Sequence, residues 1–140
     1  MIYVGSDHTG YPLKAAIIEY LIQNNHKFID CGCDGETIDY PDIAKNVCEN
    51  ILKHTENKGI LCCGTGIGMS MAANRIKGIR AAVCGDFYSA KYTRKHNNAN
   101  VICIGRHIVG DGLACGLINV FLNTMFEGGK HFQRVEKIEL

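Results

Sequence analysis

The chain contains 140 residues, of which 46% are hydrophobic and 21% are charged. This length and apolar content fit a single globular domain, residues 1–140, with a sizeable core. There are 15 basic and 14 acidic residues, so the net charge of +1 does not indicate a nucleic-acid partner. The longest apolar runs are too short to cross a membrane, and Met1 leads directly into a strand-like segment without the features of a signal peptide. We therefore expect a cytoplasmic protein with no membrane partner.

In chain order, short β-rich runs alternate with segments of helical periodicity. We predict strands and helices in the following order: strand 2–6, helix 13–21, strand 27–31, helix 43–51, strand 59–63, helix 66–76, strand 79–84, helix 87–97, strand 101–105, helix 111–126, and a charged tail with a short helix at 128–140. The strands are apolar throughout rather than alternating, which indicates burial on both faces in a parallel sheet covered by helices. The predicted fold class is α/β, a doubly wound, Rossmann-like sheet of five parallel strands with helices on both faces.

Eight cysteines raise the question of disulfides or a metal site. Most of them lie inside apolar runs or on the apolar side of helix-like segments, which favours buried, reduced thiols. The pairs Cys31/Cys33 and Cys62/Cys63 lack the two-to-four-residue gaps of zinc-binding motifs. We therefore predict no bound metal and no other cofactor.

Ligands of a doubly wound sheet bind beyond the carboxyl ends of its strands. Residues with useful chemistry follow four of the predicted strands: Asp7 and His8, Cys63, Gly85 and Asp86, and Arg106 and His107. A carboxylate, an imidazole, a thiol and a guanidinium at one rim can carry out proton transfers on an anionic substrate. Two of them have plainer interpretations, since Asp7 could be a helix N-cap and His107 a surface loop residue.

The third predicted strand ends in the most distinctive motif of the chain, Cys63 followed by Gly64, Gly66 and Gly68. Three glycines in five residues allow close backbone approach, so successive N–H groups can face one small anion at the start of the next helix. The same environment favours the reactive thiolate form of a cysteine, which can act as a base. Cys62 points to the opposite face of the strand, where a cysteine is usually a small hydrophobic residue. The motif therefore predicts a base together with an oxyanion hole.

Five sequence blocks occur in order across nearly the whole chain. They are Asp7-His8 with Gly10, Asp39-Tyr40-Pro41-Asp42, Cys63-Gly64-Thr65-Gly66-Ile67-Gly68, Arg94-Lys95-His96-Asn97, and residues 127–135, which read Glu-Gly-Gly-Lys-His-Phe-Gln-Arg-Val. In these blocks the chain resembles the type B ribose-5-phosphate isomerases, part of the wider sugar-phosphate isomerase family that includes galactose-6-phosphate isomerase. The resemblance implies an aldose–ketose isomerase that interconverts ribose 5-phosphate and ribulose 5-phosphate through an enediolate.

The resemblance implies catalytic roles for three residues. Cys63 would be the base on carbon, His96 would protonate the ring oxygen of the cyclic sugar, and Thr65 would assist at the reacting end. The enediolate oxygen would be held by the backbone N–H groups of Gly64, Thr65, Gly66, Ile67 and Gly68. Without the resemblance, His96 could instead be a cap at the end of its helix.

The resemblance also implies how the rest of the sugar phosphate is bound. Asp7 and Thr65 would orient hydroxyl groups, and Asn97 would bind the sugar. The phosphate would lie among basic side chains, namely His8, Lys130, Arg134 and His107. At two of these positions, those of Lys130 and His107, the family usually has arginine, and Arg106 stands one residue before His107. Lysine binds phosphate as a point charge, and histidine binds it as a cation only when protonated.

A site of this family is built between two subunits, with the His96–Asn97 segment and one basic residue after the fifth strand contributed by the partner. The resemblance therefore implies a homodimer with active sites at the subunit interface. Residues 117–126 are apolar on more than one face of their predicted helix, which is compatible with such an interface and equally with burial in the core.

Other functions remain open from the sequence. Gly64, Gly66 and Gly68 after a strand, with Asp86 about twenty residues on, superficially follow a dinucleotide-binding pattern. A non-catalytic sugar-phosphate-binding module is a third option, although it would not require Cys63. Among isomerases, the main alternative is a sugar phosphate of different length, such as a six-carbon one.

Overall fold

The computed structural model describes residues 1–140. Strands and helices alternate along the chain in the order β1 Ile2–Ser6, α1 Tyr11–Gln23, β2 Phe28–Asp30, α2 Tyr40–Ile51, β3 Lys58–Cys63, α3 Ile67–Ala73, β4 Ala81–Val83, α4 Phe87–Asn97, β5 Val101–Gly105, α5 Asp111–Asn123 and α6 Lys130–Ile138. No helix combines the length and the apolar character needed to cross a membrane.

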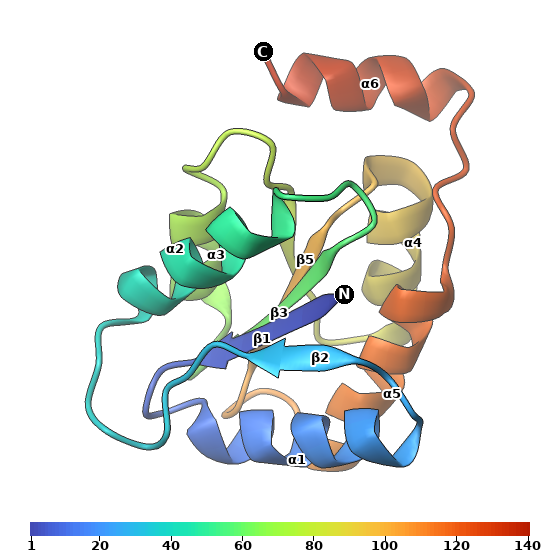
Figure 1. The fold of residues 1–140 in the computed structure, drawn as a ribbon. Coiled ribbons are helices and arrows are strands. Elements are labelled where there is room, and N and C mark those ends of the chain that lie inside the picture. The colour runs from blue at the N-terminus through green and yellow to red at the C-terminus, as the bar shows by residue number, and fades with distance from the viewer.

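The five strands form one sheet in the order β2-β1-β3-β5-β4, and every pairing is parallel (Figure 1). The register pairs Ser6 with Cys62 and Cys63 with Gly105, so the carboxyl ends of β1, β3 and β5 lie side by side. The predicted doubly wound α/β fold is confirmed.

Two apolar layers cover the sheet, one on each face. One core cluster joins β1, β3 and β5 to α1, α4 and α5 through fully buried side chains such as Leu13, Ile17 and Phe121. The other joins the sheet to α2 and α3 through side chains such as Val47 and Met69. Burying this apolar area on both faces is the main force that holds the helices to the sheet.

Burial on both faces holds for the central strands but not for the edges. β1, β3 and β5 are almost wholly buried, whereas β2 and β4 have three residues each and are partly exposed. An edge strand has only one paired neighbour, and here the helices cover it incompletely.

The third predicted helix ends earlier than expected. The Asn74 side chain accepts a hydrogen bond from the Ala81 N–H at 2.8 Å and donates one to the Ala81 carbonyl at 2.9 Å, and these bonds turn the chain toward β4.

Part of the apolar stretch 117–126 belongs to the core. Leu117, Ile118 and Phe121 are fully buried in the layer that α1 and α4 share with α5, and the helix ends at Asn123. Core burial therefore explains the apolar face of α5 that carries these three residues, whereas Met125, beyond the helix, is 83% exposed.

All eight cysteines are free thiols, and six of them are buried. Burial raises the pKa of the Cys48 thiol to about 12 and that of Cys103 well above its usual value. The prediction of reduced thiols is confirmed for the buried set, and Cys31 and Cys115 are half-buried. Core thiols with a raised pKa, such as those of Cys48 and Cys103, are chemically inert.

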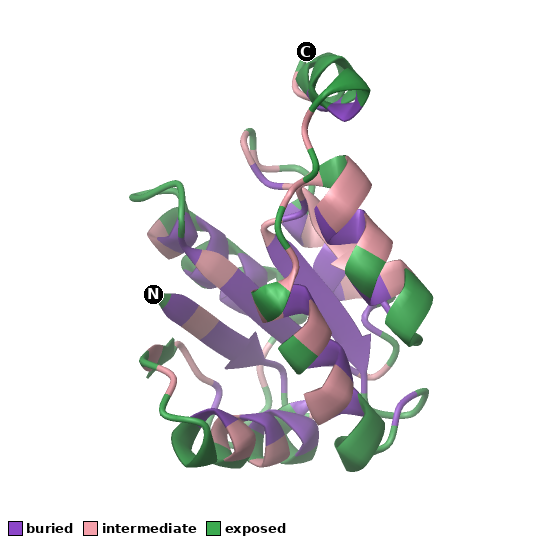
Figure 2. Cartoon of the chain, turned by 90° about the vertical axis from the view of Figure 1, so that its right-hand side faces the viewer, coloured by how far each residue is buried: buried purple, intermediate pink, exposed green.

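Helix α6 stands apart from the rest of the molecule (Figure 1, Figure 2). It packs on α4, and its carboxyl end is tied down by Glu139, which forms an ion pair with Arg80 and accepts from the Gly78 N–H at 3.2 Å. Only His131 and Val135 of this helix are buried, while Phe132 is 55% exposed. Much of the surface of α6 is therefore unpartnered within one chain.

A buried lysine connects α1 to the loop after β2. Lys14 is 1% exposed, and its Nζ donates to Asp30 Oδ1 at 2.6 Å and to the Cys33 carbonyl at 2.5 Å. An ammonium group taken this far out of water is stable only when its hydrogen bonds are met, as they are here. This contact holds the loop from β2 to α2 against the body of the protein.

We predict that Lys14→Met destabilises the fold by about 1–3 kcal/mol, because the Cys33 carbonyl and the Asp30 carboxylate lose their partner. Urea denaturation measures the free energy of unfolding. The matched control is Lys45→Met, which removes an exposed pair with Glu49 at 3.9 Å and should cost no more than about 0.5 kcal/mol. Equal effects of the two changes would contradict the role of Lys14.

Candidate active site

Three loops meet at the carboxyl edge of the sheet, where they continue the pairing of the strands. The Asp7 N–H donates to the Cys62 carbonyl at 3.3 Å, and the Arg106 N–H donates to the Cys63 carbonyl at 2.9 Å. The His107 N–H donates to the Gly64 carbonyl at 3.0 Å. The loops after β1, β3 and β5 are therefore held together by their backbones.

Glycines make this close approach possible. A Cβ at Gly10 would lie 2.3 Å from the Cys62 carbonyl oxygen, and a Cβ at Gly105 would lie 2.5 Å from the Thr65 carbonyl carbon. Both distances are far below van der Waals contact, so a side chain at either position would push the loops apart. Gly66 has φ +81°, a conformation that favours glycine, and it starts helix α3. These constraints fix the turn in which the cysteine motif sits.

Cys63 lies against the glycine turn, as predicted. The residue is 5% exposed, and its Sγ accepts a hydrogen bond from the Gly66 N–H at 3.1 Å. An N–H directed at the sulfur stabilises negative charge there. The N–H groups of Gly64, Thr65 and Gly68 donate no hydrogen bond within the chain. Three backbone donors of the turn that follows Cys63 are therefore available to an anionic oxygen.

The neighbouring cysteine points the other way. Cys62 is fully buried in the core layer of α1, α4 and α5, whereas Cys63 belongs to the layer of α2 and α3. Burial raises the pKa of the Cys62 thiol well above its usual value. The interpretation of Cys62 as a small hydrophobic residue is confirmed.

The loop after β1 and the turn after β3 carry polar side chains at the same edge of the sheet as Cys63. Asp7 is buried, and its Oδ1 accepts from the Gly10 N–H at 2.8 Å. It is not the N-cap of α1, because that position is Gly10 and carries no side-chain cap. Thr65 is exposed, and its Oγ1 accepts from the Ile67 N–H at 3.2 Å, which positions the hydroxyl at the mouth of the turn.

Two histidines border the same loops. The exposed His8 accepts from the Ile38 N–H through Nδ1 at 3.4 Å, which leaves Nε2 to face outward as a donor. His107 is exposed beside the turn, with its ring 3.5 Å from where a Cβ of Gly64 would lie. The description of His107 as a surface loop residue is compatible with a contact to substrate at this place.

The sequence assigned no role to Tyr40, although it lies in the second motif block. Its ring covers the start of α3, because a Cβ at Gly68 would lie 2.6 Å from the ring. The side chain is 40% exposed and forms one wall beside the glycine turn. The sequence feature that could have indicated Tyr40 is the Asp39-Tyr40-Pro41-Asp42 run, because a residue at the start of a helix that follows a parallel strand lies near the carboxyl edge of the sheet.

The remaining predicted site residues lie at the opposite, amino edge of the sheet. Helix α4 starts after β4 at the carboxyl edge and runs back, so its last turn ends three residues before β5 begins. α6 packs on α4 and on the residues that precede β4, beyond the start of the strands (Figure 1). This second group consists of His96, Asn97, Lys130 and Arg134. One chain therefore does not bring His96 to Cys63.

The expected contribution of a basic residue after the fifth strand by a partner stays a prediction. Within one chain, the His107 N–H donates to the Gly64 carbonyl, which places His107 at the same edge of the sheet as Cys63. The basic residues that accompany His96 are Lys130 and Arg134 on α6. The physical reason is that β5 delivers its following loop to the carboxyl edge, whereas α4 and α6 end at the other edge.

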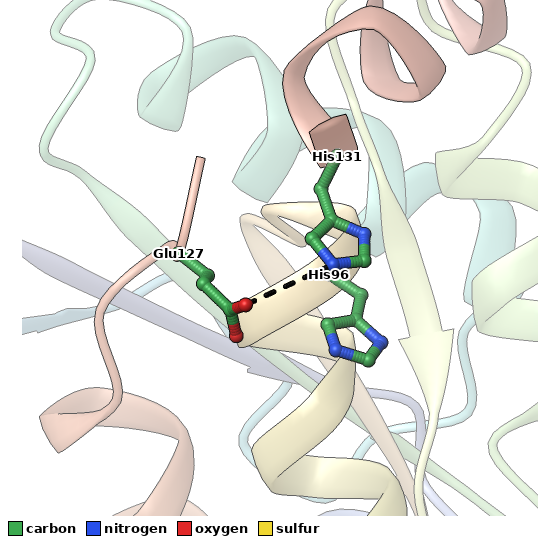
Figure 3. A group of neighbouring side chains, drawn as sticks. All are labelled: His96, Glu127 and His131. Carbon is green, nitrogen blue, oxygen red and sulfur yellow. Dashed lines mark ion pairs between the residues drawn. The ribbon is translucent and has the colours of Figure 1, made fainter. Parts of the chain in front are cut away.

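His96 lies in a cluster with His131 and Glu127 (Figure 3). The two imidazole rings stack with centroids 4.1 Å apart and planes 9° from parallel, and His131 Nε2 is 4.0 Å from Glu127 Oε1. His96 is not a cap, because α4 is capped by Asn98 with φ 48°. The sequence assigned no role to His131, although it lies in the last motif block.

This cluster is the one group of potential metal ligands in the chain, with ligand atoms within 4.8 Å of one another. Its geometry does not suit an ion. A histidine binds metal in the plane of its ring, and the planes of His96 and His131 are nearly parallel, so their nitrogens do not converge on one point. The two rings fit a stacked pair better than a metal centre.

A hollow of about 630 Å³ lies at the amino edge, between the loop from α3 to β4 and the end of α6. Arg80, Asn97 and Ile138 are among its lining residues, and Cys63 is not. The hollow and the cysteine motif therefore belong to opposite edges of the sheet.

Comparison with known proteins identifies the family. The chain matches the Ribose/Galactose Isomerase family model over residues 2–138. It belongs to that family. The resemblance inferred from the motif blocks is thereby confirmed, and the chain is a sugar phosphate isomerase rather than a dinucleotide-binding protein.

Individual relatives agree in length and fold. The chain is 43% identical to Ribose-5-phosphate isomerase B of Escherichia coli (strain K12), over 98% of this chain and 93% of that protein. It is 44% identical to D-erythrulose-4-phosphate isomerase of Pectobacterium atrosepticum, over 98% of this chain and 91% of that protein. The crystal structure of Ribose-5-phosphate Isomerase B from Mycoplasma genitalium with bound Ribulose-5-phosphate is similar with a TM-score of 0.94 and 40% identity, covering 99% of this chain and 93% of that one.

We predict that Gly10→Ala lowers the free energy of unfolding by about 1–3 kcal/mol and also lowers activity, because the new methyl group meets the Cys62 carbonyl. Denaturation and a steady-state assay measure the two effects. Gly112→Ala is the control, since nothing lies within 4 Å of its Cβ position and alanine should stabilise α5 by up to about 1 kcal/mol. A Gly10→Ala protein as stable and active as the wild type would contradict the close packing of these loops.

Proposed function

We propose that the protein interconverts ribose 5-phosphate and ribulose 5-phosphate, with Cys63 as the base that moves a proton between carbons 1 and 2. The observation that carries the proposal is the sulfur of Cys63 held at 3.1 Å from the Gly66 N–H, beside three backbone N–H groups that donate to nothing in the chain. Aldose–ketose isomerisation needs this combination, a base on carbon and donors for the oxygen that becomes negative.

In the proposed reaction, Cys63 takes the proton from carbon 2 of the open-chain aldose. The electron pair moves into the new double bond, and the carbonyl oxygen gains charge as the enediolate forms. The free N–H groups of Gly64, Thr65 and Gly68 hold that oxygen, and one such donor is typically worth about 3–4 kcal/mol. The proton of the carbon-2 hydroxyl then passes to the oxygen on carbon 1, and Cys63 returns its own proton to carbon 1. The electron pair left on the carbon-2 oxygen forms the new carbonyl, which gives the ketose.

Asp7 and Thr65 are the groups that would orient the substrate hydroxyls. The fixed Oδ1 of Asp7 leaves its second carboxylate oxygen to accept from a hydroxyl, and the exposed Thr65 Oγ1 lies at the mouth of the turn. His8 and His107 border the same loops and would face the phosphate end. All four belong to the half of the site that carries Cys63.

Ring opening and full phosphate binding require the residues at the amino edge of the sheet, and this requirement supports a homodimer. His96 would protonate the ring oxygen, Asn97 would bind the sugar, and Lys130 and Arg134 would hold the phosphate. In a two-fold dimer, the amino-edge residues of each chain can lie over the carboxyl-edge residues of the other chain. This arrangement gives two equivalent sites. The unpartnered surface of α6 and the exposed Phe132 agree with such an interface.

Two relatives and one structural neighbour bear on the length of the sugar. One relative at 43% identity is named for a five-carbon substrate and another at 44% for a four-carbon substrate, so overall identity does not discriminate between them. The five-carbon substrate is favoured by the structural neighbour that holds ribulose 5-phosphate at a TM-score of 0.94.

An isomerase assay over four-, five- and six-carbon sugar phosphates tests the substrate, and we expect the highest kcat/KM for the five-carbon pair. Cys63→Ala should lower kcat by roughly 10²- to 10⁴-fold. Cys62→Ala is its matched control and should retain most activity, because that thiol lies in the opposite core layer. A preference for another length would refute the substrate, and equal losses for the two variants would refute the base.

Mixing two inactive variants tests the shared site. Cys63→Ala and His96→Asn homodimers should each be nearly inactive, but in a mixed dimer one of the two sites keeps both residues. Random reassortment should then recover about a quarter of wild-type activity. Refolding the two variants together and assaying turnover measures this recovery. No recovery, with mixed dimers present by mass spectrometry, would mean that His96 and Cys63 do not act across an interface.

A further inference from the structure

A continuous row of aromatic rings runs along α4 and onto α6. Tyr88 and Tyr92 stack with centroids 4.4 Å apart, and Tyr92 meets His96 edge-on at 4.9 Å. His96 then lies flat against His131 at 4.1 Å (Figure 3). The His96 ring is therefore held on two sides, by Tyr92 from its own helix and by His131 from another.

His131 is itself well fixed. The residue is 7% exposed, and its Nε2 lies 4.0 Å from Glu127 Oε1. Glu127 is anchored in turn to the last turn of α4, because its N–H donates to the Lys95 carbonyl at 3.0 Å and its Oε2 lies 3.8 Å from Lys95 Nζ. The loop before α6 is thus anchored to α4 through Glu127, and it places the His131 ring over His96, which lies on that helix.

We propose that His131 is a positioning residue for His96: its neutral ring lies flat on the His96 ring, fixes its orientation and favours the protonated form that donates to the sugar ring oxygen. This inference rests on the proposed function, in which His96 opens the ring. A neutral aromatic face stabilises a cation placed over it, whereas a second cation at this distance would repel it.

The charged surroundings favour a neutral His131. Its pKa is lowered, first by burial and next by the positive charge of His96. Glu127 acts in the opposite direction, and Arg134 and Lys130 on the same helix lower the pKa further. Lys95 is the remaining charge nearby, and it pairs with Glu127. Of the two stacked rings, His131 is therefore the one that these surroundings keep neutral.

Two other roles for His131 predict different kinetics. As a phosphate ligand beside Lys130, it would act mainly on KM. As a simple core residue, it would change stability and all activities together. A positioning residue for the ring-opening acid changes turnover of the cyclic aldose while sparing proton exchange on ribulose 5-phosphate, which is an open-chain ketose and needs only the base and the oxyanion donors.

The test compares His131→Phe, which keeps a flat ring without a titratable nitrogen, with His131→Leu, which removes the ring. Turnover of ribose 5-phosphate and exchange of the carbon-1 proton of ribulose 5-phosphate with deuterated water are both measured. His131→Leu should lower kcat for ribose 5-phosphate by about tenfold and leave exchange within about twofold, whereas His131→Phe should restore kcat to within about threefold of the wild type. His54→Leu, which removes an exposed histidine before β3, is the control and should change neither rate.

The pH profile of kcat adds a readout that structural damage would not give. Loss of the ring removes stabilisation of the His96 cation, so the alkaline limb of His131→Leu should move to lower pH by about half a unit, and that of His131→Phe should stay in place. Three results would each overturn the positioning role. They are an equal loss of kcat in the His131→Leu and His131→Phe variants, a rise in KM with no change in kcat, and parallel losses of turnover and of proton exchange. A wild-type protein with neither turnover nor exchange would instead refute the proposed function.

Discussion

The structure depends on backbone contact between the loops at the carboxyl edge of the sheet. Gly10 touches the carbonyl of Cys62, Gly105 touches the backbone of Thr65, and Gly66 adopts a positive φ between them. Because no side chain fits in these contacts, the three loops can share hydrogen bonds and hold the turn after β3 in one shape. That shape aims one N–H at the Cys63 sulfur and leaves others free. The chemistry proposed for Cys63 is thus a consequence of how closely three backbones pack.

The two core layers place the adjacent thiols of Cys62 and Cys63 on opposite faces of the sheet. Adjacent residues of β3 face opposite sides of the sheet. Cys62 is therefore buried beneath α1 and α5, while Cys63 lies on the other side, next to the glycine turn. The same alternation explains why only one of these two adjacent thiols accepts a hydrogen bond from the glycine turn. Burial raises the pKa of the Cys48, Cys62 and Cys103 thiols, which keeps these three protonated.

The residues proposed for the isomerase reaction are divided between the two edges of one sheet. The proposed base and the proposed oxyanion donors lie at the carboxyl edge, and the stacked His96–His131 pair with the basic residues of α6 lies at the amino edge. A single chain therefore presents two half-sites, which is the physical basis for proposing that two chains complete each other. The amino-edge half is already shaped within one chain, since Glu127 and Tyr92 hold both rings.

The sequence by itself determined the fold class, the family and the half-site around Cys63. Continuous apolar runs require a parallel sheet, and residues that follow parallel strands must meet at one edge, so the order of residues along the chain is enough to group Asp7, Cys63 and His107. Only the tertiary structure decided which strands lie at the edges, because the exposure of β2 and β4 depends on their neighbours rather than on their own residues. It also decided that His96 lies away from Cys63 and against His131. That pairing joins residues far apart in the chain, and it exists only because α6 folds back onto the end of α4.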